Sequence, residues 1–352
     1  MKIKSAIFVG PVLLLSSVLF AQMQGALQVG QAPAPAPVPM TEKEVISELK
    51  KDSAQLMKDL EKRGVSFEVN ADIEKQLRKA HATDEIVKAV TNAGPKERAD
   101  AARAAALAGG IIMPAPEESA EYNAVRTELN PDKTIALAEA FAQKHPQSDV
   151  LSYVYMFEAN AYQTKGDADQ LVAAAEKSLA LKKDNLVTLG MLAYAIPMPQ
   201  FLKGHQADEE KQLDRAEGYC QQALKGIEVI NKPPNEPDAD FAKRKANFIS
   251  SIHSDLGMIH LDRAQLGLMG LDRGELAKAE TEYKLAVSLS DQPEATDYFR
   301  LGDTCRLQHK YDDAIAAYSK ASELGQGAVK QFADQEIEAL KKAKAQPASP
   351  KP

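Results

Sequence analysis

The sequence is poor in cysteine and has no excess of positive charge. Its 352 residues include 2 Cys, which cannot build a disulfide-rich scaffold or a four-thiolate zinc site. Lys and Arg total 43 against 50 Asp and Glu, a net charge of −7, which disfavours a nucleic-acid binder that neutralises phosphates. With 19 Gly, 19 Pro and 44% hydrophobic residues, collagen-like and wholly disordered chains are also excluded. Most of the chain must therefore fold.

Familiar catalytic and nucleotide-binding motifs are missing as well. The sequence has no Gly-x-Gly-x-x-Gly, phosphate loop, Gly-x-Ser-x-Gly or His-Glu-x-x-His. His253 and His260 would share one helix face, but Asp255 and Asp262 project elsewhere on the helical wheel and complete no ligand set. Both histidines are interpreted as packing residues. We expect no enzyme, no cofactor and no metal site, unless residues from distant parts of the chain assemble one.

The first 21 residues have the pattern of a secretory signal peptide. Lys2 and Lys4 precede an apolar run up to Ala21, which is too short to span a bilayer comfortably. Cleavage after Ala21 would leave an acidic protein, exported to the periplasm or cell envelope of a bacterium, with no transmembrane span. A retained N-terminal anchor is the alternative. Residues 22–40 alternate Ala and Pro in part, which favours an extended spacer.

Residues 41–95 are predicted to form a small helical module. Thr41 and Glu44 make a capping box, and apolar stripes at helical spacing follow. Residues 65–69 alternate like a short extended segment. The module resembles helical units that precede repeat arrays in some bacterial envelope proteins, and we expect it to pack or dock rather than catalyse. Residues 96–118, alanine-rich and containing Gly109-Gly110, are interpreted as a linker.

The remainder, 119–343, repeats a two-helix pattern. In the last copy, Tyr298, Leu301-Gly302 and Cys305 are followed after eight residues by Ala314, Tyr318 and Ala321. The first set puts a glycine beside a stripe of bulky residues on the first helix. The second set puts a small-large-small stripe on the antiparallel partner helix, so the two helices can pack closely. Four earlier copies keep this frame, over Tyr122 to Pro146, Tyr155 to Ser178, Leu189 to Ala223 and His253 to Ala286.

This pattern resembles the tetratricopeptide (TPR) repeat. Lys310-Tyr311-Asp312-Asp313-Ala314-Ile315 stands where that family has its aromatic-acidic-alanine run. The resemblance implies an all-α fold, an array of about five antiparallel helix pairs (a TPR-like solenoid) preceded by the small module. Separate helical hairpins without a common groove are the alternative. Residues 344–352 are expected to be a disordered tail.

Two copies carry insertions between their helices, near 197–213 and 261–274. The segment 197–201, Pro-Met-Pro-Gln-Phe, is predicted to break a helix and expose apolar groups, whereas 261–271 is predicted to lengthen one. Cys220 and Cys305 occupy inward positions of the third and fifth pairs. We therefore expect two buried thiols that are too far apart for a disulfide.

The TPR resemblance also implies a binding surface. In that family the first helix of each pair lines a concave surface on which a peptide or protein segment lies. The lysine and asparagine set that clamps a C-terminal carboxylate in some members is incomplete here, which disfavours a free peptide carboxylate. The expected partner-binding residues are Tyr153, Met156 and Asn160 in the second pair, Met191 and Tyr194 in the third, and Phe299, Arg300, Asp303 and Arg306 in the last.

The leading hypothesis is a non-enzymatic protein-protein interaction scaffold of the bacterial cell envelope, which binds a peptide or protein segment on the concave face. Its expected partner is a protein or peptide, with no nucleic acid and no small-molecule cofactor. Two alternatives stay open. One is an accessory factor for the assembly of outer-membrane or secreted proteins, and the other is a hydrolase or sensor with a site at the repeat insertions.

Overall fold

The computed structural model describes residues 38–98, 112–232, 236–266 and 270–345. The expected signal peptide, most of the Ala-Pro spacer, Gly109-Gly110 and residues 346–352 lie outside the described residues. The chain divides into two compact units. Among the described residues, one unit comprises 38–98, 112–124 and 145–150, and the other comprises 125–144 together with the described residues from 151 onward. Within these ranges, no helix is both long and apolar enough to cross a membrane.

Four short helices make up the N-terminal module, α2 (Glu42–Leu49), α3 (Ser53–Arg63), α4 (Ala71–Lys79) and α5 (Asp84–Asn92). The predicted capping box is confirmed, because the Thr41 side chain accepts from the Glu44 amide and Glu44 Oε2 accepts from Thr41 N at 2.7 Å. The module buries a core of its own, which includes Val45, Leu56 and Leu77. The expected extended segment is reduced to a single parallel bridge between Met40 and Val65.

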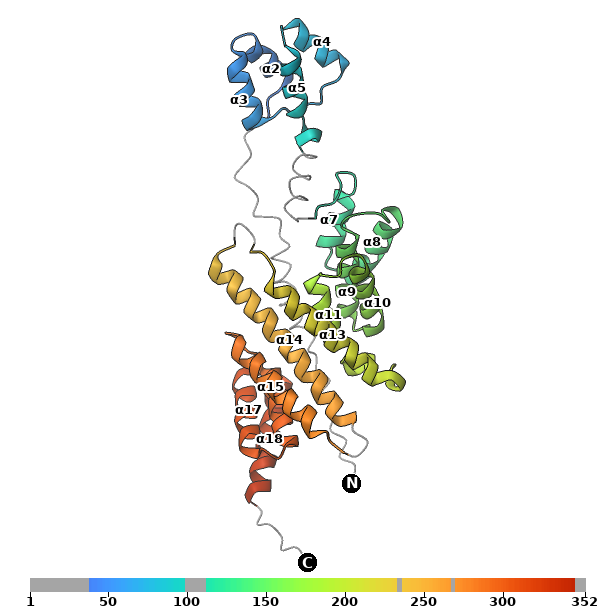
Figure 1. The fold of residues 1–352 in the computed structure, drawn as a ribbon, viewed down its shortest axis with the longest axis vertical. Helices are drawn as coiled ribbons and strands as arrows, with labels where there is room; N and C mark the ends of the chain where they lie inside the picture. The colour runs from blue at the N-terminus through green and yellow to red at the C-terminus, as the bar shows by residue number, and fades with distance from the viewer. Residues whose placement is uncertain (1–37, 99–111, 233–235, 267–269, 346–352) are drawn as a thin grey trace, which may run out of the picture. The chain divides into compact units, whose positions relative to one another are not determined.

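The helices of the repeat region pair in chain order. Within the second unit, α9 packs on α10, α11 on α13 and α14 on α15 (Figure 1), and α16 packs on α17. A short helix α12 (Pro199–Leu202) and a 3₁₀ turn η2 (Gln206–Asp208) lie between α11 and α13. The helices are α7 (Ser119–Thr127), α8 (Pro131–Lys144), α9 (Leu151–Lys165), α10 (Ala168–Leu181), α11 (Leu186–Ala195), α13 (Glu209–Glu228), α14 (Asp238–Leu266), α15 (Arg273–Leu289), α16 (Ala295–Leu307), α17 (Tyr311–Leu324) and α18 (Gly327–Ala345).

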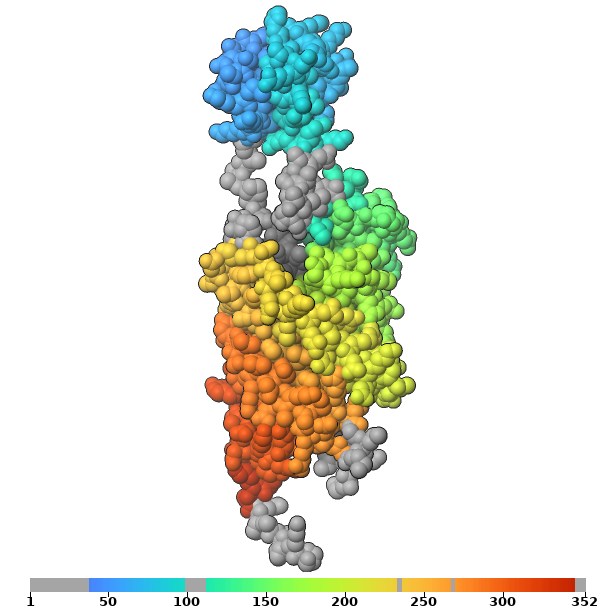
Figure 2. All heavy atoms as spheres, in the orientation of Figure 1, coloured from blue at the N-terminus to red at the C-terminus, as the bar shows by residue number. Residues whose placement is uncertain are grey.

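Successive pairs also pack on one another. Helix α10 contacts α11, α13 contacts α14, and α15 contacts α16. The first helices meet directly as well, because α14 contacts both α11 and α16. In the view of Figure 2 the atoms of α13, α14 and α15 form an unbroken surface. The fold is therefore an all-α, TPR-like array of helix pairs preceded by a small helical module, and the alternative of separate hairpins is wrong.

Close approach at glycine holds two of the pairs together. A Cβ atom placed on Gly302 of α16 would lie 2.6 Å from the Tyr318 ring of α17, and one on Gly257 of α14 would lie 2.8 Å from the Tyr283 ring of α15. Both tyrosines are fully buried. Each ring thus occupies the space that a side chain would need, which confirms the close packing expected from the Leu-Gly and Ala-x3-Tyr spacing.

The first insertion differs from its prediction. Exposed apolar groups are expected over 197–201, but Phe201 and Leu202 of α12 are buried. The Phe201 ring stacks on His205 with ring centroids 4.0 Å apart, and His205 Nδ1 lies 2.9 Å from the Phe201 carbonyl oxygen. Proline ends α11, and the chain folds back so that the released apolar groups return to the core.

The second insertion lengthens α14 as predicted, up to Leu266. The helix also begins at Asp238, well before the repeat frame requires, which the sequence pattern does not predict. Helix α18 is a further element that the pattern misses, because its basic end, Lys341 to Lys344, resembles a frayed tail. It buries Ala333, Ile337 and Leu340 against the last pair.

The two cysteines agree with their prediction. Cys220 of α13 and Cys305 of α16 are both buried and free. Burial raises the pKa of the Cys220 thiol well above its usual range and that of Cys305 to about 11. Both thiols therefore stay protonated at neutral pH and behave as small apolar side chains.

A buried carboxylate ties α15 to the end of α16. Glu280 accepts hydrogen bonds from Lys284 Nζ at 2.6 Å, Lys310 Nζ at 2.5 Å and Gln308 Nε2 at 2.8 Å. Burial raises the pKa of Glu280, but these three hydrogen bonds outweigh burial and lower the pKa to about 2. The ionised form is therefore the one that the folded state stabilises.

The glycine contact predicts a large effect of one methyl group. Gly302→Ala should lower the free energy of unfolding by about 1–3 kcal/mol, because the Tyr318 ring has no room to move. Gly218→Ala on α13 is the control, since nothing lies within 4 Å of its added Cβ, and alanine favours a helix over glycine by up to about 1 kcal/mol. Urea unfolding of both variants measures the difference. A Gly302→Ala protein as stable as the parent would show that α16 and α17 do not approach this closely.

The Glu280 network predicts acid sensitivity. Because the folded pKa lies below the unfolded one of about 4.3, the stabilisation is complete above that value and is lost as the pH falls toward 2. Glu280→Gln should lower the free energy of unfolding at pH 7 by about 1–3 kcal/mol and flatten its decline between about pH 4.5 and 2. Glu323→Gln, which removes an exposed ion pair with Lys320, should change little. Equal pH profiles for Glu280→Gln and the parent would contradict this role.

Candidate functional site

The partner-binding residues expected on α9 are only partly accessible. Tyr153 and Asn160 are half-buried, but Met156 is completely buried. The sulfur of Met156 lies 3.8 Å from Asn185 Nδ2, at the start of α11. The helical spacing predicts one exposed and one buried face on this helix. The expectation is wrong for Met156 because α9 packs against both α8 and α10 and reaches the turn before α11, so it is buried on several sides.

In the third pair, one of the two expected partner-binding residues is buried as well. Met191 of α11 is buried and offers no surface in this conformation, whereas Tyr194 is half-buried. The physical reason is again crowding, since α11 contacts α10, α13 and α14. Tyr194 therefore remains the accessible member of the two.

Three of the four expected residues on α16 are engaged within the fold. Phe299 packs on Tyr318 with ring centroids 5.3 Å apart. The Tyr318 hydroxyl donates to Asp303 Oδ1 at 2.7 Å, and Arg306 donates to both the Tyr318 oxygen and Asp303. Arg306 also pairs with Glu336 of α18 at 3.6 Å. This network fastens α16 to α17 and α18, so its charges are already matched inside the protein.

The fourth residue, Arg300, lies with Tyr194 among carboxylates that the sequence analysis does not select. Asp255 and Asp262 come from α14, and Asp297 comes from the first turn of α16. The charge of Arg300 acts on all three carboxyl groups and on Tyr194. We call this set of Tyr194, Asp255, Asp262, Asp297 and Arg300 the α11–α14–α16 face.

Hydrogen bonding on this face is incomplete. Ser254 Oγ donates to Asp297 Oδ1 at 2.5 Å. Within the part of the chain that the structure describes, no group donates a hydrogen bond to the carboxylates of Asp255 or Asp262 or pairs with the guanidinium of Arg300 within 4 Å. Asp255 is nevertheless only 6% exposed. These three side chains therefore keep their capacity to bind a further group.

Burial dominates the electrostatics of the face. It raises the pKa of Asp255 well above its usual range, that of Asp262 to about 7, and that of Asp297 more modestly. The positive charge of Arg300 opposes each shift, whereas neighbouring carboxylates increase it, Asp297 for Asp255 and Glu209 for Asp262. One cation thus faces four acidic groups.

Two equivalent tyrosines show how this face differs from the last pair. The hydroxyl of Tyr318 is paired with Asp303 and Arg306, as described above. The hydroxyl of Tyr283, which packs in the same way against α14, is buried and has no hydrogen-bond partner among the described residues. At the positions that correspond to Asp303 and Arg306 in the repeat frame, α14 carries Met258 and Leu261. The fourth pair therefore lacks the polar network that closes the fifth.

The sequence pattern points to Asp255 and Asp262 of α14 only as neighbours of the two histidines. His253 Nδ1 contacts Glu282 Oε2 at 2.6 Å and His260 Nδ1 contacts Glu275 Oε2 at 2.7 Å, both on α15. The histidines therefore face the partner helix, as packing residues should. Asp255, Met258 and Asp262, however, stand at i, i+3 and i+7, the spacing that selects Tyr153, Met156 and Asn160 on α9. Applied to α14, that rule would have found them.

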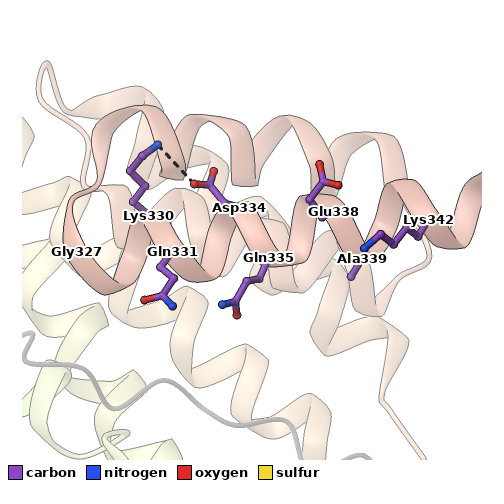
Figure 3. Close-up of a pocket in the computed structure, with 8 residues that line it drawn as sticks. All are labelled: Gly327, Lys330, Gln331, Asp334, Gln335, Glu338, Ala339 and Lys342. Atoms are coloured by element: carbon purple, nitrogen blue, oxygen red, sulfur yellow. Dashed lines mark ion pairs between the residues drawn. The ribbon is translucent and has the colours of Figure 1, made fainter.

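A hollow lies along α18, but its chemistry points to no ligand. Its described lining consists of exposed residues from this one helix (Figure 3). Lys330 and Asp334 pair along the helix at 3.6 Å. Among the described residues, no group of three or more His, Cys, Asp or Glu side chains is arranged to hold a metal ion. The α11–α14–α16 face, to which three helices contribute, is the stronger candidate.

Comparisons with known proteins return structures rather than sequence relatives. No protein family and no curated protein matches the sequence. A thermophilic TPR protein from Thermus thermophilus is 18% identical over 62% of this chain and 99% of its own, with a TM-score of 0.37. A tetratricopeptide repeat protein from Parabacteroides merdae is 13% identical over 64% and 97%, with a TM-score of 0.23. The P58(IPK) TPR domain is 11% identical over 87% and 79%, with a TM-score of 0.24. Likeness at this level says nothing about function.

Proposed function

We propose that this protein is a non-enzymatic interaction scaffold of the bacterial cell envelope, which binds a peptide or protein segment along its first helices. The observation that carries the proposal is the α11–α14–α16 face. Three helices bring together an aromatic ring, an arginine and aspartates, of which Asp255, Asp262 and Arg300 have no partner among the described residues. Unpaired groups of this kind favour a partner that supplies the missing hydrogen bonds.

The first part of the surface adds contacts of another kind. Tyr153 and Asn160 are half-buried on α9, and no described group forms a hydrogen bond with the Asn160 side-chain amide. An amide can donate to and accept from a peptide backbone, and a tyrosine ring gives apolar area with little loss of entropy. A segment that lay along α9 and continued to α16 would meet both sets.

The packing of the insertions disfavours the competing proposal of a hydrolase or sensor site there. Phe201 and Leu202 are buried rather than exposed as a lid, and the insertion after α14 continues that helix to Leu266. The other alternative, an accessory role in outer-membrane or secreted-protein assembly, uses the same face and differs only in the identity of the partner.

Site-directed photocrosslinking tests the surface. With a benzophenone amino acid in place of Tyr194 or Asn160, cells that make the protein should yield a discrete adduct with another polypeptide after irradiation. The same probe at Gln222, an exposed residue on the second helix α13, is the matched control and should give none. Adducts confined to Gln222, or identical at all three positions, would contradict binding along the first helices.

Export is tested independently of binding. The pattern from Lys2 to Ala21 leads us to expect a chain in the envelope fraction that begins near Gln22. N-terminal sequencing of that fraction decides the matter. A chain that still begins at Met1 would refute cleavage, and a chain found only in the cytoplasm would refute the envelope location.

A further inference from the structure

The α11–α14–α16 face has more negative than positive groups. Asp255, Asp262 and Asp297 lie around Arg300, and Glu209 of α13 acts on Asp262 as well. Because the acidic groups already outnumber the single guanidinium, an added carboxylate would increase the acidic excess, whereas an added cation would reduce it. The charge pattern therefore favours a cationic group from the partner.

Two of these carboxylates have unused hydrogen-bonding capacity. Asp297 is held by Ser254 at 2.5 Å, whereas Asp255 and Asp262 accept no hydrogen bond from any residue in the described ranges. Asp255 is 6% exposed, and a buried carboxylate without a partner is costly to the folded state. The cost is removed when a donor reaches it.

Asp255 and Asp262 stand on one side of α14. They are seven residues apart, about 10 Å along a helix, and the buried Met258 lies between them in the sequence. Lysine and arginine carry their charge on a long apolar stem, so a basic side chain of a segment that lies along α14 can direct its charge to these carboxylates. Tyr194 from α11 adds an aromatic ring whose phenol lies close enough to feel the charges of Asp255 and Arg300.

We propose that the α11–α14–α16 face is a recognition site for a lysine or arginine side chain of the bound segment, held by Asp255 and Asp262. This inference rests on the proposed function and specifies the chemistry of the partner. Arg300 acts as a positioning residue, because its charge opposes the rise that burial causes in the pKa of the Asp255 and Asp262 carboxyl groups.

Every element packed around α14 contributes a group to the electrostatics of the site. These are Tyr194 from α11, Glu209 and Cys220 from α13, Tyr283 from α15, and Asp297 and Arg300 from α16. Because Tyr283 and Cys220 have strongly raised pKa values, they stay neutral at physiological pH. The aspartates, with Glu209, are thus the groups whose ionisation responds to a bound cation.

A displayed library tests the proposal although the natural partner is unidentified. Random twelve-residue peptides are selected on the purified full chain, and the recovered sequences are synthesised with a fluorophore for anisotropy measurements. Each peptide is made in three forms, with its central basic residue retained or replaced by norleucine or glutamate. The protein variants are Asp255→Asn with Asp262→Asn, and Asp240→Asn as a control on an exposed residue of the same helix. Thermal unfolding of each variant verifies that it is folded.

The expected result is a recurrent Lys or Arg in the selected peptides, with binding at least tenfold weaker after replacement by norleucine. The double variant should bind the basic peptide at least tenfold more weakly than the parent does, and should bind the norleucine form with the affinity of the parent. Asp240→Asn should change neither affinity. Peptides that bind this face equally well with norleucine or glutamate would overturn the inference and leave the proposed function standing. Failure to select any peptide that binds this face would overturn both the inference and the proposed function.

The pH dependence of binding gives an independent readout. A bound cation favours ionised Asp262, whose pKa is about 7 in the free protein, so binding should release protons below that pH. The affinity for the basic peptide should therefore be about threefold to tenfold higher at pH 8 than at pH 6. The double variant should show no such change. A parent protein that binds the basic peptide equally at both pH values would contradict the role of Asp262.

Discussion

The contact between a glycine on the first helix of a pair and a tyrosine on the second sets the geometry on which the rest of the array depends. At Gly257 and Gly302 the backbone itself touches the Tyr283 and Tyr318 rings, so the two helices lie closer than side chains would otherwise allow. Because the second helix is held tightly, the next first helix can pack beside the previous one. That is how α14 comes into contact with both α11 and α16.

The same geometry determines which polar groups are buried. Because α14 packs on its partner and on both neighbouring first helices, the stripe that carries Asp255 and Asp262 is enclosed, with Asp255 buried and Asp262 half-buried. On α16 the equivalent stripe is closed by Asp303, Arg306 and the capping helix α18, which supplies Glu336. The last pair therefore uses its charges to end the array, whereas the fourth pair leaves its charges unmatched.

The helix pairs could be predicted from the sequence because close packing demands specific residues at fixed spacing. Leu301-Gly302 with Ala314, Tyr318 and Ala321 allows few other arrangements, and the structure has that one. Exposure was harder to predict. Met156 and Met191 lie on faces that a periodic pattern leaves open, but contacts from neighbouring pairs bury them, and such contacts depend on residues far away in the chain. The folding back of Phe201 has the same origin.

The candidate site was partly predictable for a related reason. Tyr194 and Arg300 follow from the repeat frame alone, whereas the importance of Asp255 and Asp262 comes from what surrounds them after three helices meet. A carboxylate on a helix is ordinary until burial removes water and leaves it without a donor.

Burial of unpaired carboxylates beside one guanidinium lowers stability, and the chain shows with Tyr318, Asp303 and Arg306 that this fold can satisfy such groups internally. The fourth pair has Met258 and Leu261 at the corresponding positions, so the hydroxyl of its tyrosine, Tyr283, has no hydrogen-bond partner among the described residues. One array thus contains a closed and an open version of the same arrangement. The difference between them is best understood if the open version is completed by a group that arrives with a partner.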